Sequence, residues 1–128
     1  MERKVLMPDN MAKPRVYSQG IKVGNTIYVA GQAPFDQESK LVGKGSIEAQ
    51  TKQTWDNVKS VLEAAGATMA DIVKVTVYLR NYKENVRPAW EVRLKYFEPP
   101  YPASTGLEIS GLADPDQLIE VDVIAVVD

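Results

Sequence analysis

Two carboxylates near the end of the chain have the residue types and the spacing that proton chemistry needs. Glu120 and Asp122 lie in the apolar run LIEVDVIAVV, residues 118–127. Side chains alternate between the faces of a strand, so both carboxylates would share one face, about 7 Å apart. Partial burial would raise the pKa of such a carboxyl group and suit it to moving protons or holding a water molecule. A polar strand end that faces solvent has the same pattern, so the spacing alone leaves both interpretations open.

The composition excludes several other kinds of catalytic site. The chain contains no His and no Cys, which removes the Ser-His-Asp triad, the thiolate nucleophile and the usual zinc ligand sets. Neither a phosphate-binding glycine loop nor the acidic spacing of an EF-hand is present. Proton transfer is therefore left to Glu, Asp, Tyr, Lys or ordered water.

Size and charge predict one ordinary globular domain that spans residues 1–128. Fifteen basic and seventeen acidic residues give a net charge of −2, which lacks the basic excess that binding to a nucleic-acid backbone needs. No apolar run approaches the ~20 residues of a membrane span. The first ten residues lack the apolar segment of a signal peptide. We therefore expect a cytoplasmic protein without a membrane or nucleic-acid partner.

Six segments have the composition or the alternation of β-strands, and the last of them carries the two carboxylates. Tyr17 opens the second segment, and a two-residue turn at Gly24 and Asn25 joins the second segment to the third as a hairpin. One face of the fourth segment is aliphatic and consists of Val73, Val75, Val77 and Leu79. The predicted strands are residues 4–6, 17–23, 26–30, 71–80, 104–109 and 118–127.

Two helices are predicted between these strands. Ser46 caps the first helix, an apolar stripe with a 3–4 spacing follows, and Gly66 ends it. Pro88 is predicted at the first position of the second helix, where Trp90 serves as a packing anchor. From residue 17 on, the order strand-strand-helix-strand-helix-strand-strand predicts an α+β layer with both helices on one face of the sheet. The other face keeps apolar side chains such as Ile124 and Val126, which suggests oligomerisation.

Taken in order, five segments resemble the RidA/YjgF family of reactive-intermediate (enamine/imine) deaminases. The resemblance covers nearly the whole chain. The segments are YSQG at residues 17–20, VAGQAP at 29–34, the first helix at 50–66, DIVKVTVYL at 71–79, and PA at 102–103 followed by IEVDVIA at 119–125.

The resemblance implies a chorismate-mutase-like α+β fold, with a mixed sheet and a homotrimer that has clefts between its subunits. In active members the cleft binds a small 2-imino acid: an arginine holds the substrate carboxylate and a glutamate positions the hydrolytic water. No metal and no organic cofactor are used. Carried over by position, Tyr17 would line the cleft, Gly31 would offer backbone contacts and Glu120 would hold the water.

The chain departs from the family pattern on the substrate side of the cleft. Ser104 stands where active members have the carboxylate-binding arginine, and Trp90 stands where they often have asparagine. A charged hydrogen bond contributes about 1.5–3 kcal/mol, so its loss would cost roughly 10- to 100-fold in affinity for imino acids. The hydroxyls of Ser104 and Thr105, expected to face the carboxylates, suit a less charged ligand. Alternatively, an arginine of the second helix, Arg87 or Arg93, reaches the cleft.

Three functions follow from this pattern. We favour a hydrolase, an imine or enamine deaminase with a shifted substrate choice. The second interpretation is a non-catalytic trimer that binds a metabolite or a protein. The third, ribonuclease or translation-inhibitor activity, ranks lowest because the chain is acidic and lacks His.

Overall fold

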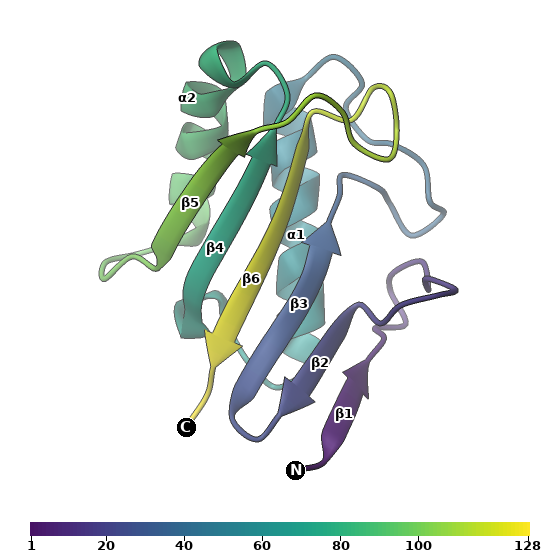
Figure 1. Cartoon of the computed structure of the whole chain (residues 1–128), viewed down its shortest axis with the longest axis vertical. Helices are drawn as coiled ribbons and strands as arrows, with labels where there is room; N and C mark the ends of the chain where they lie inside the picture. Colours follow the sequence, from purple (N-terminus) through teal and green to yellow (C-terminus); the bar gives the residue numbers. More distant parts are fainter.

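A mixed six-stranded sheet with two α-helices on one of its faces makes up the fold (Figure 1), in a computed structural model that describes all 128 residues. This architecture confirms the predicted α+β class and the helices on a single face. The strands are β1 (Arg3–Leu6), β2 (Gly20–Val23), β3 (Thr26–Gln32), β4 (Ile72–Leu79), β5 (Ala103–Glu108) and β6 (Ile119–Val126). The helices are α1 (Ile47–Ala64) and α2 (Tyr82–Arg93), with short 3-10 turns at Met69–Asp71 and Leu94–Tyr96.

The strand that carries Glu120 and Asp122 lies in the middle of the sheet. The strand order is β1-β2-β3-β6-β4-β5, and only the β4–β5 pair is parallel. Glu120 lies opposite Tyr78 of β4, and Asp122 lies opposite Thr76. The alternate residues of β6, including Val121 and Val123, are buried toward the helices. Both carboxylates therefore project from the open face of the sheet, as the alternation predicts.

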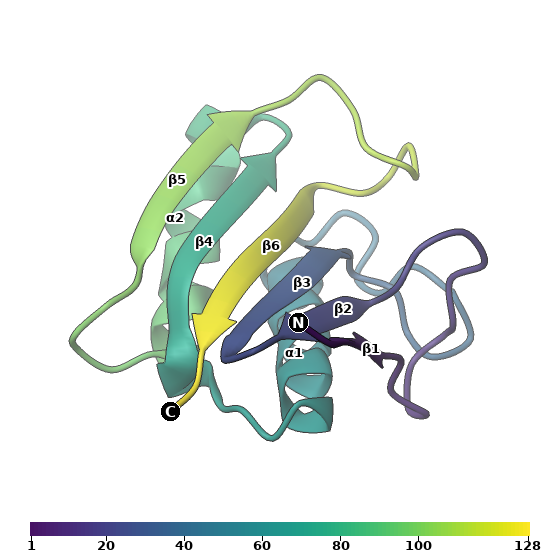
Figure 2. The same ribbon diagram turned by 60° about the horizontal axis from the view of Figure 1, so that its bottom comes forward.

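Helix α1 supplies most of the core that covers the other face. The hydroxyl of Ser46 accepts a hydrogen bond from the Ala49 N–H at 3.1 Å, which is the predicted N-terminal cap. Its buried stripe fits the predicted 3–4 spacing and includes Trp55, Val58, Val61 and Leu62. Helix α1 packs behind β3 and β6, and α2 lies behind β4 and β5 (Figures 1 and 2). No helix is both long enough and apolar enough to span a bilayer.

Helix α2 begins six residues before Pro88, so the predicted start of this helix is wrong. One distant and one local contact stabilise its first turn: Glu108 of β5 accepts a hydrogen bond from the Tyr82 N–H at 3.0 Å, and Asn85 donates one to the nearby Arg80 carbonyl at 2.7 Å. Pro88 instead lies inside the helix. The predicted packing role of Trp90 is also wrong, because its side chain is 56% exposed and the core tryptophan is Trp55, at 1%.

Two strand predictions need correction at their ends, and a third needs correction in the face of one residue. Strand β2 begins at Gly20, so Tyr17 lies outside the sheet, because the Gln19 side chain turns inward to bond Gln32. Strand β3 continues to Gln32. Val73 is exposed because the β4–β6 register shifts between Ile72 and Lys74, which turns this one valine out of the predicted aliphatic face.

The two tryptophans provide a test of this packing. Trp55→Ala would leave a large cavity under the sheet and should lower the free energy of unfolding by about 3–5 kcal/mol. Trp90→Ala is the matched control and should change it by less than about 1 kcal/mol, because the ring is mostly exposed. Urea titrations at one fixed protein concentration measure both values. A larger loss for Trp90→Ala than for Trp55→Ala would contradict the described core.

Candidate functional site

Glu120 is a partly buried carboxyl group on the open face of the sheet. The pKa of Glu120 is raised, mainly because the carboxyl group is partly buried. A hydrogen bond from Gln117 Nε2, at 3.4 Å from Oε1, opposes this rise, and the negative charge of Asp122 adds to it. A carboxylate in this environment is a stronger base than one in water. Glu120 is therefore partly buried, which the spacing of the two carboxylates alone could not decide.

Gly31 makes the space that the Glu120 carboxyl group occupies. A Cβ atom at residue 31 would lie 2.9 Å from the carboxyl carbon of Glu120, and closer still to its Oε2 atom. The backbone of β3 also leaves the β6 ladder here, because the register shifts between Val29 and Gln32. Such bulges re-aim a strand and are common beside active sites. Glycine is therefore required at residue 31 for the backbone and the carboxyl group to meet.

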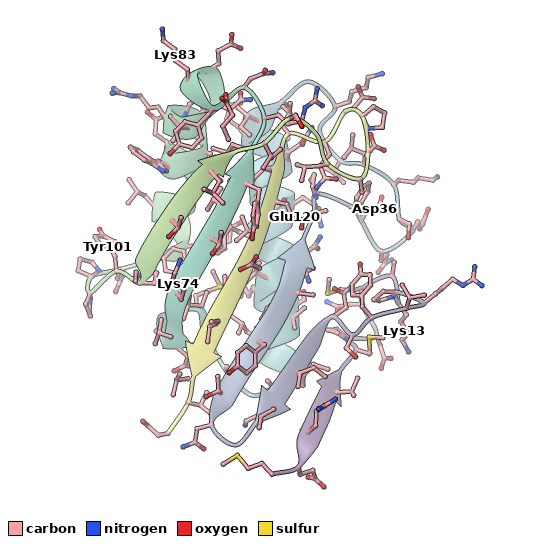
Figure 3. All side chains as sticks on the ribbon, viewed as in Figure 1. Lys13, Asp36, Lys74, Lys83, Tyr101 and Glu120 are labelled. Carbon is pink, nitrogen blue, oxygen red and sulfur yellow. The ribbon has the colours of Figure 1, made fainter.

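Glu120, Gly31 and Tyr17 line one cavity of about 700 Å³ at this end of the sheet. The rest of its wall comes mainly from two loops, residues 10–14 and 35–39, and from the middle of α1, which carries Gln53 and Asn57. Figure 3 shows Glu120 on the same side of the molecule as the loops that carry Asp36 and Lys13. Tyr17 is half exposed at the rim. The structure thus brings together three of the residues predicted for the site.

Buried amide side chains in the wall of this cavity were not singled out from the sequence. Gln32 Nε2 donates to Gln19 Oε1 at 2.8 Å, and both side chains are buried. Asn57 of α1 donates to the carbonyls of Ala33 and Phe35, at 2.8 and 2.9 Å. A signal was present, since Asn57 is a polar residue on the apolar stripe of a helix. These amides fix the backbone on either side of Gly31.

Asp122 differs from Glu120 in its partners. The hydroxyl of Tyr78 donates a hydrogen bond to Asp122 Oδ2 at 2.9 Å, and this bond is the main cause that raises the pKa of Tyr78. Thr76 separates Asp122 from Thr105 along the open face, and Lys74 donates to the Thr105 hydroxyl at 3.0 Å. Asp122 and Thr105 thus belong to a polar row of the sheet and line none of the cavities around Glu120.

Ser104 does not face Glu120 within the chain, which corrects the expectation from the sequence. Ser104 lies beside Val75 of β4, whose side chain is buried on the helix side, so the two hydroxyl residues of β5 point to opposite faces. Ser104 and Trp90 line a second cavity of about 360 Å³ that shares no residue with the first. Figure 3 shows Tyr101, another residue of this second cavity, at the opposite edge of the sheet from Lys13.

The two arginines proposed as substitutes for the missing guanidinium differ in position. Arg87 is exposed on α2 and forms no ion pair. Arg93, the last residue of α2, is partly buried and lines the second cavity. Its Nη1 atom donates to the Ser104 hydroxyl at 2.9 Å. Burial lowers the pKa of Arg93.

Comparisons with known proteins find relatives along nearly the whole chain. Residues 8–127 match the family model described as endoribonuclease L-PSP. The chain is 44% identical to a RutC family protein of Pyrococcus abyssi, over 98% of each chain. It is 34% identical to a 2-iminobutanoate/2-iminopropanoate deaminase of Dermatophagoides farinae, over 88% of this chain and 86% of that one. A crystal structure of a Rid-family protein from Yersinia pestis superposes with a TM-score of 0.92 at 32% identity, covering 98% of this chain and all of that one.

The burial of Glu120 predicts a pH-dependent stability difference. Because the folded pKa of Glu120 is raised, the native chain retains a proton that the unfolded chain loses as the pH rises, so ionised Glu120 destabilises the fold. Glu120→Gln should therefore gain stability relative to the wild type between about pH 4 and about pH 7.5. Urea titrations at both pH values measure this gain, with Glu63→Gln on the exposed side of α1 as the control. A variant that loses stability toward neutral pH would contradict the buried position.

Proposed function

Since this chain belongs to the RidA/YjgF family, the family whose model is described as endoribonuclease L-PSP, we propose that it is a hydrolase that releases ammonia from small imines or enamines. The observation that carries this proposal is the partly buried Glu120 carboxyl group packed against Gly31 in a cavity of about 700 Å³. A general base works best when its pKa approaches the operating pH. The raised pKa of Glu120 moves this carboxyl group in that direction.

In the proposed reaction, Glu120 holds a water molecule and takes one of its protons. The water oxygen forms a bond to the imine carbon, and Glu120 passes the water proton to the imine nitrogen, which gives a tetrahedral carbinolamine. Glu120 then takes the proton of the carbinolamine hydroxyl and gives it to the amino nitrogen. The carbon–nitrogen bond breaks as the carbon–oxygen double bond forms, ammonia leaves with a carbonyl product, and Glu120 is ionised again. One water is consumed for each ammonia released. An enamine follows the same course after it tautomerises to the imine.

Gly31 and Tyr17 would orient the substrate beside this water. The bulged backbone around Gly31 has no side chain between it and the Glu120 carboxyl group, so a small ligand can approach its backbone polar groups closely. Tyr17 would close the rim of the cavity. The substrate choice is proposed to be non-classical, because Ser104 carries no charge and lies in the other cavity.

The assay for this proposal measures ammonia release from freshly generated 2-iminopropanoate and 2-iminobutanoate. The relative from Dermatophagoides farinae is named as a deaminase of these two compounds. We expect turnover above the protein-free blank, and a loss of about 100-fold or more in kcat/KM for Glu120→Gln, because general acid–base groups contribute about 10²–10⁴-fold. Small imines without a carboxylate test the shifted substrate choice in the same assay.

Asp122→Asn is the matched control, since it changes the other carboxylate of the same strand face. It should lose less than about tenfold, because Asp122 bonds Tyr78 and does not line the cavity. The absence of any rate above the blank with all imines, or an unaltered rate in Glu120→Gln, would contradict the hydrolase. Saturable binding without turnover would then favour the non-catalytic binding module.

We also propose a homotrimer with clefts between its subunits. Apolar side chains on the helix-free face support an assembly that covers it; they are Val5, Ile21, Tyr28, Ile124 and Val126. All six residues of the edge strand β5 are exposed as well. Light scattering of the purified protein should give three times the 14.2 kDa mass of one chain. A mass of one chain or two would contradict the trimer.

A further inference from the structure

Gln117 is a fully buried side chain that contacts the Glu120 carboxyl group but does not line the cavity. Its Nε2 atom donates to the Ile119 carbonyl at 3.0 Å and to Glu120 Oε1 at 3.4 Å. Its own Oε1 atom is buried and has no hydrogen-bond partner. Buried polar atoms are ordinarily paired, and an unpaired one lowers stability. The amide is therefore oriented to serve two acceptors of β6 at the expense of its own oxygen.

Contacts on both sides fix the backbone of Gln117, which ends the loop between β5 and β6 (Figure 1). Gln50 of α1 donates to the carbonyl of the residue before Gln117 and accepts from the N–H of the residue after it. Arg80, which follows β4, donates to the carbonyls of Pro115 and Gln117. Because a helix and a neighbouring strand both hold this backbone, the amide is positioned before any substrate binds.

The two oxygens of the Glu120 carboxyl group have different neighbours. Oε1 accepts the bond from Gln117. Oε2 faces the backbone of Gly31, since a Cβ atom at residue 31 would overlap it, and Gly31 lines the cavity. A hydrogen bond to a carboxylate oxygen favours the ionised form, so the bonded oxygen takes a proton less readily than the free one. The proton from water should therefore go to Oε2.

The titratable groups around Glu120 come from several elements. Burial and the negative charge of Asp122 raise the pKa of Glu120, whereas the bond from Gln117 lowers it. Tyr78 of β4 lies opposite Glu120, and its own pKa is raised, so it is neutral near pH 7. The other titratable side chains in the cavity wall come from the flanking loops and are Lys13, Tyr17, Asp36 and Glu38. The Gln117 amide thus opposes burial and favours the ionised carboxylate, which is the form that acts as a base.

We propose that Gln117 is a positioning residue of the site: its amide holds Oε1 of Glu120, favours the ionised carboxylate and leaves Oε2 as the oxygen that takes the proton from water. The positioning role rests on the proposed hydrolase, whereas the contact between the two side chains does not. Since Gln117 does not line the cavity, its loss should affect kcat and leave KM nearly unchanged.

Gln117→Met removes the amide and keeps an unbranched side chain of similar length. The pKa of Glu120 should rise by at least about half a pH unit, because the ionised form loses its hydrogen bond. Carbon-13 NMR of protein labelled at its glutamate side chains measures this pKa, and Glu120→Gln identifies the signal. Asp122→Asn is the matched control with the opposite sign, since removal of its negative charge should lower the pKa of Glu120. An unchanged or lowered pKa of Glu120 in folded Gln117→Met would overturn the proposal.

A measurement on the wild type decides the question if Gln117→Met does not fold. The side-chain N–H signals of Gln117 should move with pH at the midpoint of the Glu120 carbon signal, because their acceptor changes charge there. Glu120→Gln should abolish this movement. Signals of Gln117 that do not follow the ionisation of Glu120 would overturn the proposed contact.

The imine assay tests the positioning role. Gln117→Met should lower kcat by about 3- to 10-fold with KM within about twofold, because the carboxyl group is less well oriented. The acidic limb of its pH profile should move to higher pH, since Glu120 must be ionised to act as a base. A raised KM with an unchanged kcat would overturn the positioning role.

The outcomes for Gln117 and for the hydrolase remain distinguishable, because the NMR titrations need no turnover. A raised pKa of Glu120 in Gln117→Met, in a protein that releases no ammonia from imines, supports the contact and contradicts the hydrolase. Turnover that depends on Glu120, with the pKa of Glu120 unaltered in Gln117→Met, supports the hydrolase and overturns the role of Gln117.

Discussion

The loops around Glu120 depend on hydrogen bonds from buried amide side chains, because loop backbone beside a core must find partners there. Gln50 of α1 accepts a bond from the Leu118 N–H at 2.7 Å and donates to the carbonyls of Asp116 and Gly43. One fully buried side chain thereby connects the helix, the loop before it and the entry to β6. Asn57, two turns along, does the same for the chain that leaves β3. The helix that forms the core also determines where the site residues lie.

The position of Glu120 shows why such support is needed. A carboxyl group taken partly out of water lowers stability when it is ionised, and its only side-chain hydrogen-bond donor, Gln117, lies at the long distance of 3.4 Å. The bulge around Gly31 also interrupts the regular pairing of β3 with β6 at the same point. Local stability is reduced where the proposed chemistry occurs, and the α1 core, with Trp55, Val58 and Val61 fully buried, offsets it.

The sequence predicted the features that depend on local periodicity. The buried stripe and Ser46 cap of α1, the hairpin turn at Gly24, and the shared face of Glu120 and Asp122 all follow from near neighbours. The errors arose where contacts between residues far apart in the sequence determine the local structure. Glu108 of β5 stabilises the first turn of α2, and the side chain of Gln32 donates a hydrogen bond to the buried side chain of Gln19 just before β2. The contact of Arg93 with Ser104 requires the parallel β4–β5 pairing, which no spacing reveals.

Two cavities have no lining residue in common: Gly31 of β3 and Glu120 of β6 line one of them, and residues of β4, β5 and α2 line the other. Substitutions in separate places with no shared contacts combine nearly additively. Mutations around Trp90, Arg93 and Ser104 can therefore accumulate without disturbing the packing of Gly31 against Glu120. In evolutionary terms, the wall of the cavity beside Ser104 and the surroundings of Glu120 can vary independently within one chain. A lineage can change the cavity at the edge strand β5 while it keeps the carboxyl group of the central strand β6.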